Sequence, residues 1–123
     1  MPEGGHIANT IFERAVLIDS SALYALADKR DNRHREALIC LTRIDSNSFP
    51  VFVSNGTIYE AYRLILHKLG IQRALLFLNN IYDGSTAVER ITEEDEKNAR
   101  QYLQRFSDQP ITYIDALNLA IMK

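Results

Sequence analysis

Short apolar runs alternate with longer helical segments along most of this chain, and that alternation strongly limits the folds open to it. Residues 15–18 form an apolar run too short for a helix, which predicts a buried strand. A second strand begins at Phe49 or Val51 within FPVFVS, and STAVERI at residues 85–91 is the third. Because helical segments separate all three strands, we expect an α/β domain with a mainly parallel sheet.

The segments between and after the strands carry helix patterns and helix-end signals. Asp19 or Ser20 is expected to cap the first helix, and Gly70 is typical of the residue that follows one. Two T-x-x-D patterns, at Thr92 and Thr112, are typical of capping boxes at helix starts. Helices are expected over residues 20–27, 55–69 and 71–83, and apolar residues at helical spacing indicate others around residues 37–44, after Thr92 and after Thr112.

Bulk composition limits the partners and the compartment. The 123 residues carry a net charge of -2, so binding of nucleic acid would need a local basic patch. Cys40 is the only cysteine, which excludes an internal disulfide and favours a reducing compartment; we expect it in the core. No signal peptide or membrane span is recognisable, so we expect a cytoplasmic protein without membrane contacts. We expect residues 1–14 to be a flexible tail and residues 15–123 to form one domain.

Several common catalytic signatures are missing from the sequence. It contains no glycine-rich phosphate loop and no G-x-S-x-G, and its three histidines lack the spacing of metal ligands. What remains is a set of carboxylates near the expected element ends: Asp19, Glu60 and Asp115. Hard oxygen ligands suit Mg²⁺ or Mn²⁺, and such ions promote phosphodiester hydrolysis.

The three acids lie in the stretches VLIDSSALYALADKRDNRHREA, VSNGTIYEAYRLI and QPITYIDALNLAIM. Together these stretches resemble the PIN domain, the nuclease fold of many prokaryotic toxin–antitoxin ribonucleases. The resemblance implies a three-layer α/β/α fold with a mainly parallel central sheet. It also implies that Asp19, Glu60 and Asp115 hold one or two Mg²⁺ or Mn²⁺ ions. RNA would then be hydrolysed without a covalent enzyme intermediate.

The sequence departs from the family pattern at its end. The family commonly continues past the third acid to another strand and a fourth acidic residue. This sequence ends at Lys123, before either one. We therefore expect a fold that lacks the C-terminal strand, leaves one edge of the first strand unpaired, and has weakened activity.

Each acid also has an ordinary structural interpretation. Asp19 could only cap the following helix, and Asp115 could only complete a capping box. Glu60 could form a weak surface pair with Arg63. The resemblance favours metal ligation for all three. Candidate supporting hydrogen-bond donors, which are also ordinary cap or turn residues, are Thr112, Ser20, Ser54 and Asn55.

The densest group of basic residues follows the first expected helix. Its members are Lys29, Arg30, Arg33 and Arg35. This group could hold RNA phosphates beside the acids, although nearby carboxylates dilute its charge and a solvated loop is the alternative.

The expected partners follow from the resemblance and from apolar surface. We expect RNA as the substrate, a cognate antitoxin as a protein partner, and a homodimer. The helices over residues 55–69 and 71–83 carry more apolar surface than one small sheet covers. A catalytically inactive PIN-like module that binds RNA or protein is the alternative function.

Overall fold

A computed structural model describes residues 16–47 and 50–122 of the chain. Within them, three short strands form one sheet in the order β1-β2-β3, with both neighbouring pairs parallel. The strands are β1 (Val16–Leu17), β2 (Val51–Ser54) and β3 (Ala87–Glu89). Parallel pairing brings the carboxyl ends of the strands to one edge of the sheet, and β1 is an edge strand among the described residues. The expected tail over residues 1–14 lies outside the described residues.

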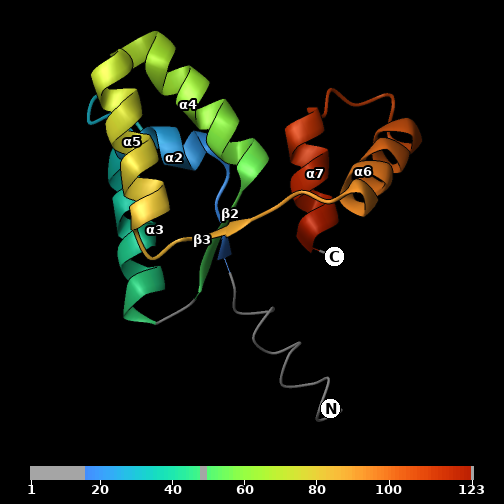
Figure 1. Cartoon of the computed structure of the whole chain (residues 1–123), viewed down its shortest axis with the longest axis horizontal. Helices are drawn as coiled ribbons and strands as arrows, with labels where there is room; N and C mark the ends of the chain where they lie inside the picture. The colour runs from blue at the N-terminus through green and yellow to red at the C-terminus, as the bar shows by residue number, and fades with distance from the viewer. Residues whose placement is uncertain (1–15, 48–49, 123) are drawn as a thin grey trace.

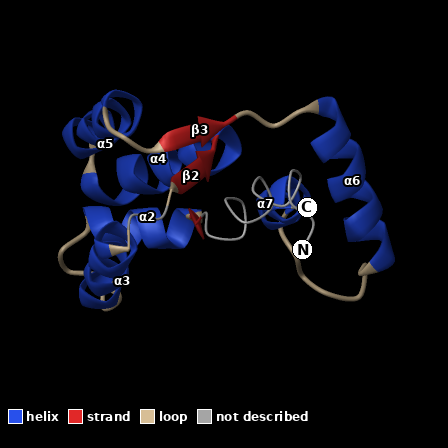
Figure 2. Ribbon diagram, turned by 90° about the horizontal axis from the view of Figure 1, so that it is seen from below, coloured by secondary structure: helices blue, strands red, loops and turns tan. Residues whose placement is uncertain are grey.

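Six helices complete the described part of the fold. They are α2 (Ser20–Ala27), α3 (His34–Ser46), α4 (Asn55–Leu69), α5 (Ile71–Asp83), α6 (Glu93–Arg105) and α7 (Tyr113–Met122). Helices α2 to α5 gather on one side of the strands, whereas α6 and α7 lie on the other (Figure 1, Figure 2). The predicted three-layer α/β/α architecture is therefore confirmed.

Local signals explain where these helices begin and end. Asp19 caps α2 by accepting a hydrogen bond from the backbone N–H of Ala22 at 2.9 Å. Thr92 and Asp95 form both hydrogen bonds of the predicted capping box at the start of α6. Gly70 separates α4 from α5 with φ at 94°, a left-handed conformation that favours glycine.

The two sides of the molecule have separate hydrophobic cores. The larger core joins β2 with α2, α4 and α5, and includes Val53, Ile58 and Ile65, all with an exposed fraction of 0%. The smaller core lies between α6 and α7 around Ala99 and Leu117. The α6–α7 pair is thus packed around its own core. Contacts outside that core have to attach the pair to the sheet. None of the helices over residues 16–47 and 50–122 is long and apolar enough to cross a membrane.

Candidate metal and phosphate site

Asp19 stands where the chain leaves β1 and starts α2. Just before it, the backbone N–H of Ile18 donates to the carbonyl oxygen of Phe52 at 3.0 Å, which ties this segment to β2. Asp19 Oδ1 accepts hydrogen bonds from the Ala22 backbone at 2.9 Å and the Ser21 hydroxyl at 3.0 Å. Asp19 Oδ2 has no hydrogen-bond partner among the described residues, and the side chain is exposed.

Glu60 reaches the same end of α2 through a serine. The hydroxyl of Ser20 donates a hydrogen bond to Glu60 Oε1 across a sequence separation of 40 residues. Glu60 is half-buried, and it forms no ion pair with Arg63 in the described part of the chain. This contact therefore brings Glu60 to the residue that follows Asp19.

Asp115 lies in the first turn of α7 and is exposed. Its backbone N–H donates to Thr112 Oγ1 at 3.1 Å, so Thr112 caps the helix. The carboxylate of Asp115 accepts no hydrogen bond from any described residue. Thr112 therefore acts on the backbone of Asp115, and the carboxylate stays available.

A buried polar cluster of Ser54, Thr57 and Asn118 attaches α7 to the end of β2. Ser54 Oγ donates to Asn118 Oδ1 at 2.9 Å, and Asn118 Nδ2 donates to Thr57 Oγ1 at 3.1 Å. Ser54 Oγ also accepts from the Thr57 backbone at 3.1 Å and so caps α4. Asn118 follows Asp115 by three residues, so both lie on one face of α7. The cluster therefore turns the Asp115 face of α7 toward the start of α4.

Gly56 permits a second close contact between these elements. A Cβ atom at this position would lie 2.9 Å from Ile91 Cδ1 and 3.0 Å from Ile114 Cδ1. Asn55 Oδ1 accepts a hydrogen bond from the Ile91 backbone at 3.0 Å. The segment that leads into α6 and the first turn of α7 thus pack against the first turn of α4. Asn55 secures this packing and, like Ser54, forms no hydrogen bond with the three acids.

The donor atoms of the three acids fit a hard divalent cation. All are carboxylate oxygens, and each acid keeps at least one oxygen that no described residue contacts by a hydrogen bond. However, the described residues contain no group of three or more His, Cys, Asp or Glu side chains that could hold a metal ion. The structure therefore brings Glu60 to the residue after Asp19 and turns α7 toward the start of α4, but does not gather all three acids in one preformed cluster.

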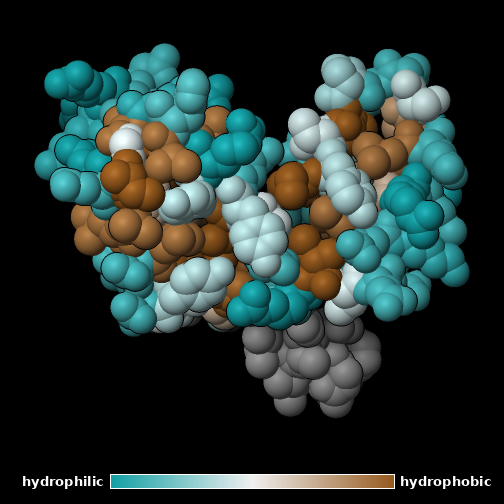
Figure 3. All heavy atoms as spheres, turned by 45° about the horizontal axis from the view of Figure 1, so that its top comes forward, coloured by the Kyte–Doolittle hydropathy of each residue, from teal (hydrophilic) through white to brown (hydrophobic). Residues whose placement is uncertain are grey.

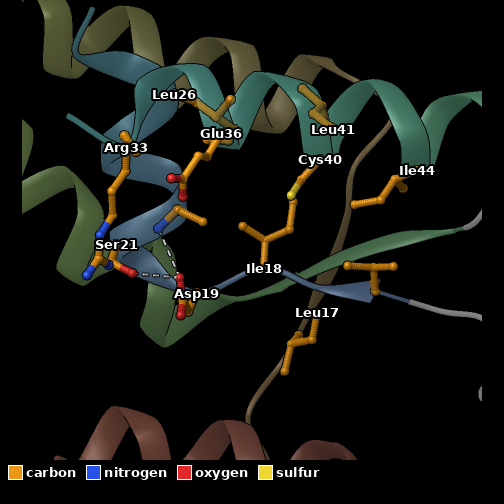
Figure 4. Close-up of a pocket in the computed structure, with 14 residues that line it drawn as sticks. Leu17, Ile18, Asp19, Ser21, Leu26, Arg33, Glu36, Cys40, Leu41 and Ile44 are labelled. Atoms are coloured by element: carbon orange, nitrogen blue, oxygen red, sulfur yellow. Dashed lines mark hydrogen bonds between the residues drawn. The ribbon is translucent and has the colours of Figure 1, made fainter. Parts of the chain in front are cut away.

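An apolar groove of about 370 Å³ runs beside Asp19, between β1, α2 and α3 (Figure 4). Arg33 lines this groove, and its side chain extends toward Ser21 and Asp19. Arg33 is thus the predicted basic residue best placed to contact a phosphate near the acids. The expectation that Cys40 is a core residue is wrong: it is exposed and lines the same groove, because no described element packs over this side of α3.

Two pKa shifts occur at the opposite end of α2. The Tyr24 hydroxyl donates a hydrogen bond to Asp28 Oδ2. This bond, together with burial and the negative charge of Asp28, raises the pKa of Tyr24 from 10.0 to about 12. The same bond, the backbone N–H of Arg30 and nearby arginines lower the pKa of Asp28 below its ordinary value. Asp28 therefore stays ionised at neutral pH.

Comparison with known proteins decides the family. The PIN domain profile matches residues 16–123. The chain belongs to the PIN domain family. In this PIN domain, Asp19 follows β1, Glu60 lies in the α4 helix that follows β2, and Asp115 lies in the first turn of α7.

Two relatives from Mycobacterium tuberculosis resemble this PIN domain over most of its length. Ribonuclease VapC26 is 26% identical over 106 residues, covering 86% of this chain and 76% of the relative. The 23S rRNA-specific endonuclease VapC20 is 26% identical over 109 residues, covering 88% and 80%. A crystal structure of VapC20, described as a toxin that cleaves the sarcin–ricin loop, has a TM-score of 0.76 at 25% identity. The structural match covers 87% of this chain and 80% of the VapC20 chain.

Sequence patterns did not single out Thr57 and Asn118, although both belong to the joint between α7 and the sheet. The available signal was weak: each follows a predicted helix-start residue by three positions, Ser54 for Thr57 and Asp115 for Asn118. Thr57 and Asn118 lie 61 residues apart in sequence, so only the fold reveals the hydrogen bond between them.

Proposed function

We propose that this PIN domain is a divalent-metal-dependent endoribonuclease that hydrolyses phosphodiester bonds of single-stranded RNA. The observation that carries the proposal is the Ser20–Glu60 hydrogen bond, which links Glu60 of α4 to the residue after Asp19 at the carboxyl end of β1. Asp19 Oδ2, Glu60 Oε2 and the Asp115 carboxylate accept no hydrogen bond from a described residue, so these oxygens are available to a metal ion. Membership of a nuclease family and likeness to two VapC ribonucleases support the same function.

Asp19, Glu60 and Asp115 would hold Mg²⁺ or Mn²⁺ through their free oxygens. The ion would lower the pKa of a water molecule and offset negative charge on the phosphodiester. Ser20 fixes the orientation of Glu60, and the helix start of α7 favours the negative charge of Asp115. Arg33 would bind the RNA phosphate beside these acids.

The cellular role that we propose is that of a toxin with a cognate antitoxin, acting in the cytoplasm. This rests on the relative whose structure is described as a toxin. A homodimer through α4 and α5 is part of the same proposal. Three exposed apolar side chains of α5 support it: Ile71, Leu75 and Leu76 have exposed fractions of 51%, 48% and 56%. Figure 3 shows hydrophobic residues gathered on the part of the molecule that α2 to α5 form.

The test is incubation of the purified chain with a labelled single-stranded RNA and Mg²⁺, Mn²⁺ or a chelator. We expect internal cleavage with at least one metal and none with the chelator. Binding without any cleavage under either metal would contradict the proposal and favour the inactive RNA-binding module. Millimolar Mn²⁺ should also raise the thermal midpoint of the wild-type chain, but not that of Asp19→Asn.

A further inference from the structure

A second pocket lies at the far end of α2 from Asp19 and carries concentrated positive charge. It has a volume of about 380 Å³ and is lined by Asp28, Lys29, Arg30, Lys68, Leu69 and Arg73. We call it the basic pocket. Four cations and one carboxylate line it, a local balance of 4 − 1 = +3, whereas the whole chain carries -2. The cations come from three separate segments: the turn after α2, the end of α4 and the start of α5.

The cations of the basic pocket are not neutralised by ion pairs. None of Lys29, Arg30 and Arg73 forms an ion pair with a described residue, and all three are exposed. Lys68 lies 5.0 Å from the ring centroid of Tyr24, a cation–π contact that leaves its charge uncompensated. Unpaired cations that converge on one hollow favour an anionic ligand.

The single carboxylate of the pocket is already engaged. Asp28 accepts hydrogen bonds from the Tyr24 hydroxyl and, at 3.0 Å, from the backbone N–H of Arg30. Tyr24 is buried, and its ring also contacts Lys68. Tyr24 thus holds both Asp28 and Lys68 in place, whereas the side chains of Arg30 and Arg73 interact with Asp28 only through the charge that lowers its pKa.

The distance between the basic pocket and the acids indicates how long a ligand that contacts both must be. Asp19 and Asp28 flank the eight residues of α2, which span about 12 Å at 1.5 Å per residue. Because Leu23, Tyr24 and Ala25 of α2 are buried, an RNA strand that contacts both ends of this helix has to pass over neighbouring elements and span several nucleotides. Arg33 serves the acid end, whereas Lys68 and Arg73 serve the far end.

We propose that the basic pocket binds a phosphate of single-stranded RNA several nucleotides from the bond cut at the acids. The position of the phosphate relative to the cut bond rests on the proposed ribonuclease function. RNA binding by the pocket does not depend on cleavage. The pocket anchors longer RNA and is out of reach of RNAs too short to contact both ends of α2. It reads charge and carries no base specificity.

The test is RNA binding by the full chain without divalent metal and with a chelator present, so that no cleavage is needed. Fluorescence anisotropy would measure the Kd for single-stranded RNAs of two and of ten nucleotides at several salt concentrations. The variant Lys68→Ala/Arg73→Ala is compared with Lys97→Ala/Arg100→Ala, which removes two exposed cations from α6. Thermal midpoints check that both variants fold. If Lys68→Ala/Arg73→Ala does not fold, Lys68→Gln/Arg73→Lys replaces it.

We expect the pocket variant to weaken binding of the longer RNA about tenfold, and its salt slope to fall by about 0.7 for each lost phosphate contact. The Kd of the α6 control variant for the longer RNA, and the Kd of the pocket variant for the dinucleotide, should change little. Equal losses in both variants, or unchanged binding in the pocket variant, would overturn the proposal; the second result would leave the pocket to an acidic protein partner. Once cleavage is established, the pocket variant should raise KM for the longer RNA while kcat stays the same. A chain that binds RNA through the pocket but never cuts it would refute only the ribonuclease function.

Discussion

At the scale of single residues, small hydroxyl groups decide where the acids point. Glu60 lies away from the main apolar face of α4, so helical spacing alone offered only a surface pair with Arg63. Ser20 instead donates a hydrogen bond to it and leaves Oε2 free. Glu60 was a candidate from the sequence because its position matched a family pattern. Its partner was not predictable, because no local signal links residues 20 and 60.

Ser20→Ala should weaken metal binding without unfolding the chain. Loss of the hydroxyl releases Glu60, and residues that orient a metal ligand typically contribute about 10- to 100-fold in affinity or activity. Calorimetric titration with Mn²⁺ would measure the Kd. Ser46→Ala, which removes an exposed hydroxyl from the end of α3, is the matched control. An unchanged Kd in Ser20→Ala would show that Glu60 needs no such support.

Tyr24 should titrate at higher pH than an ordinary tyrosine. Its folded pKa of about 12 exceeds the ordinary value of 10.0, so the stability that this phenol contributes is complete below pH 10.0 and is lost as pH rises toward 12. Ultraviolet absorbance of tyrosinate would follow the titration. Asp28→Asn removes the carboxylate and should bring the late step back toward the ordinary value. A wild-type titration without a late step would contradict the assigned contact.

At the scale of elements, local signals predicted helix ends well. The predicted range 20–27 is the observed α2, and Gly70 and the Thr92 capping box end and begin helices as expected. The contacts between elements were not predictable in the same way. Asn118 joins α7 to Ser54 and Thr57 across about half of the chain, and only the folded chain brings these residues together.

Asn118→Ala should destabilise the fold and also displace Asp115. The change leaves the buried hydroxyls of Ser54 and Thr57 with fewer partners, and each unsatisfied buried group costs about 1–3 kcal/mol. Urea unfolding would measure the free energy, and the Kd for Mn²⁺ would report on Asp115. Asn79→Ala on the exposed side of α5 is the control and should change neither quantity. A loss of stability with an unchanged Kd for Mn²⁺ would show that the cluster does not position Asp115.

At the scale of the whole molecule, the fold class followed from the alternation of strands and helices, but the division into two packed units did not. The small core between α6 and α7 is separate from the larger one around β2 and α4. The basic residues that sequence order placed in one group are also divided. Arg33 lies by the acids, whereas Lys29 and Arg30 lie in the basic pocket with Lys68 and Arg73. Sequence proximity does not reveal which end of α2 a side chain serves.

The apolar surface of α5 should form an interface between two copies of the chain. Sedimentation at micromolar concentration is expected to show a species of twice 14.1 kDa. Leu75→Asp/Leu76→Asp should reduce it to the monomer, because a charge in an apolar contact is costly to bury. Leu38→Asp, an equally exposed position on α3, should leave the dimer intact. A wild-type chain that sediments only at 14.1 kDa would remove this interface from the account.

The central claim is that Asp19, Glu60 and Asp115 act as one metal-dependent hydrolytic site. Its most direct test is the rate of Mn²⁺-dependent RNA cleavage by Asp19→Asn, Glu60→Gln and Asp115→Asn, with Asp83→Asn on α5 as the control. Each of the three changes keeps the shape of the side chain and removes its charge. Each should reduce cleavage to the level measured without metal, and double variants should be no worse than single ones, because residues of one site are non-additive. Cleavage at the wild-type rate by any of the three variants would contradict the claim.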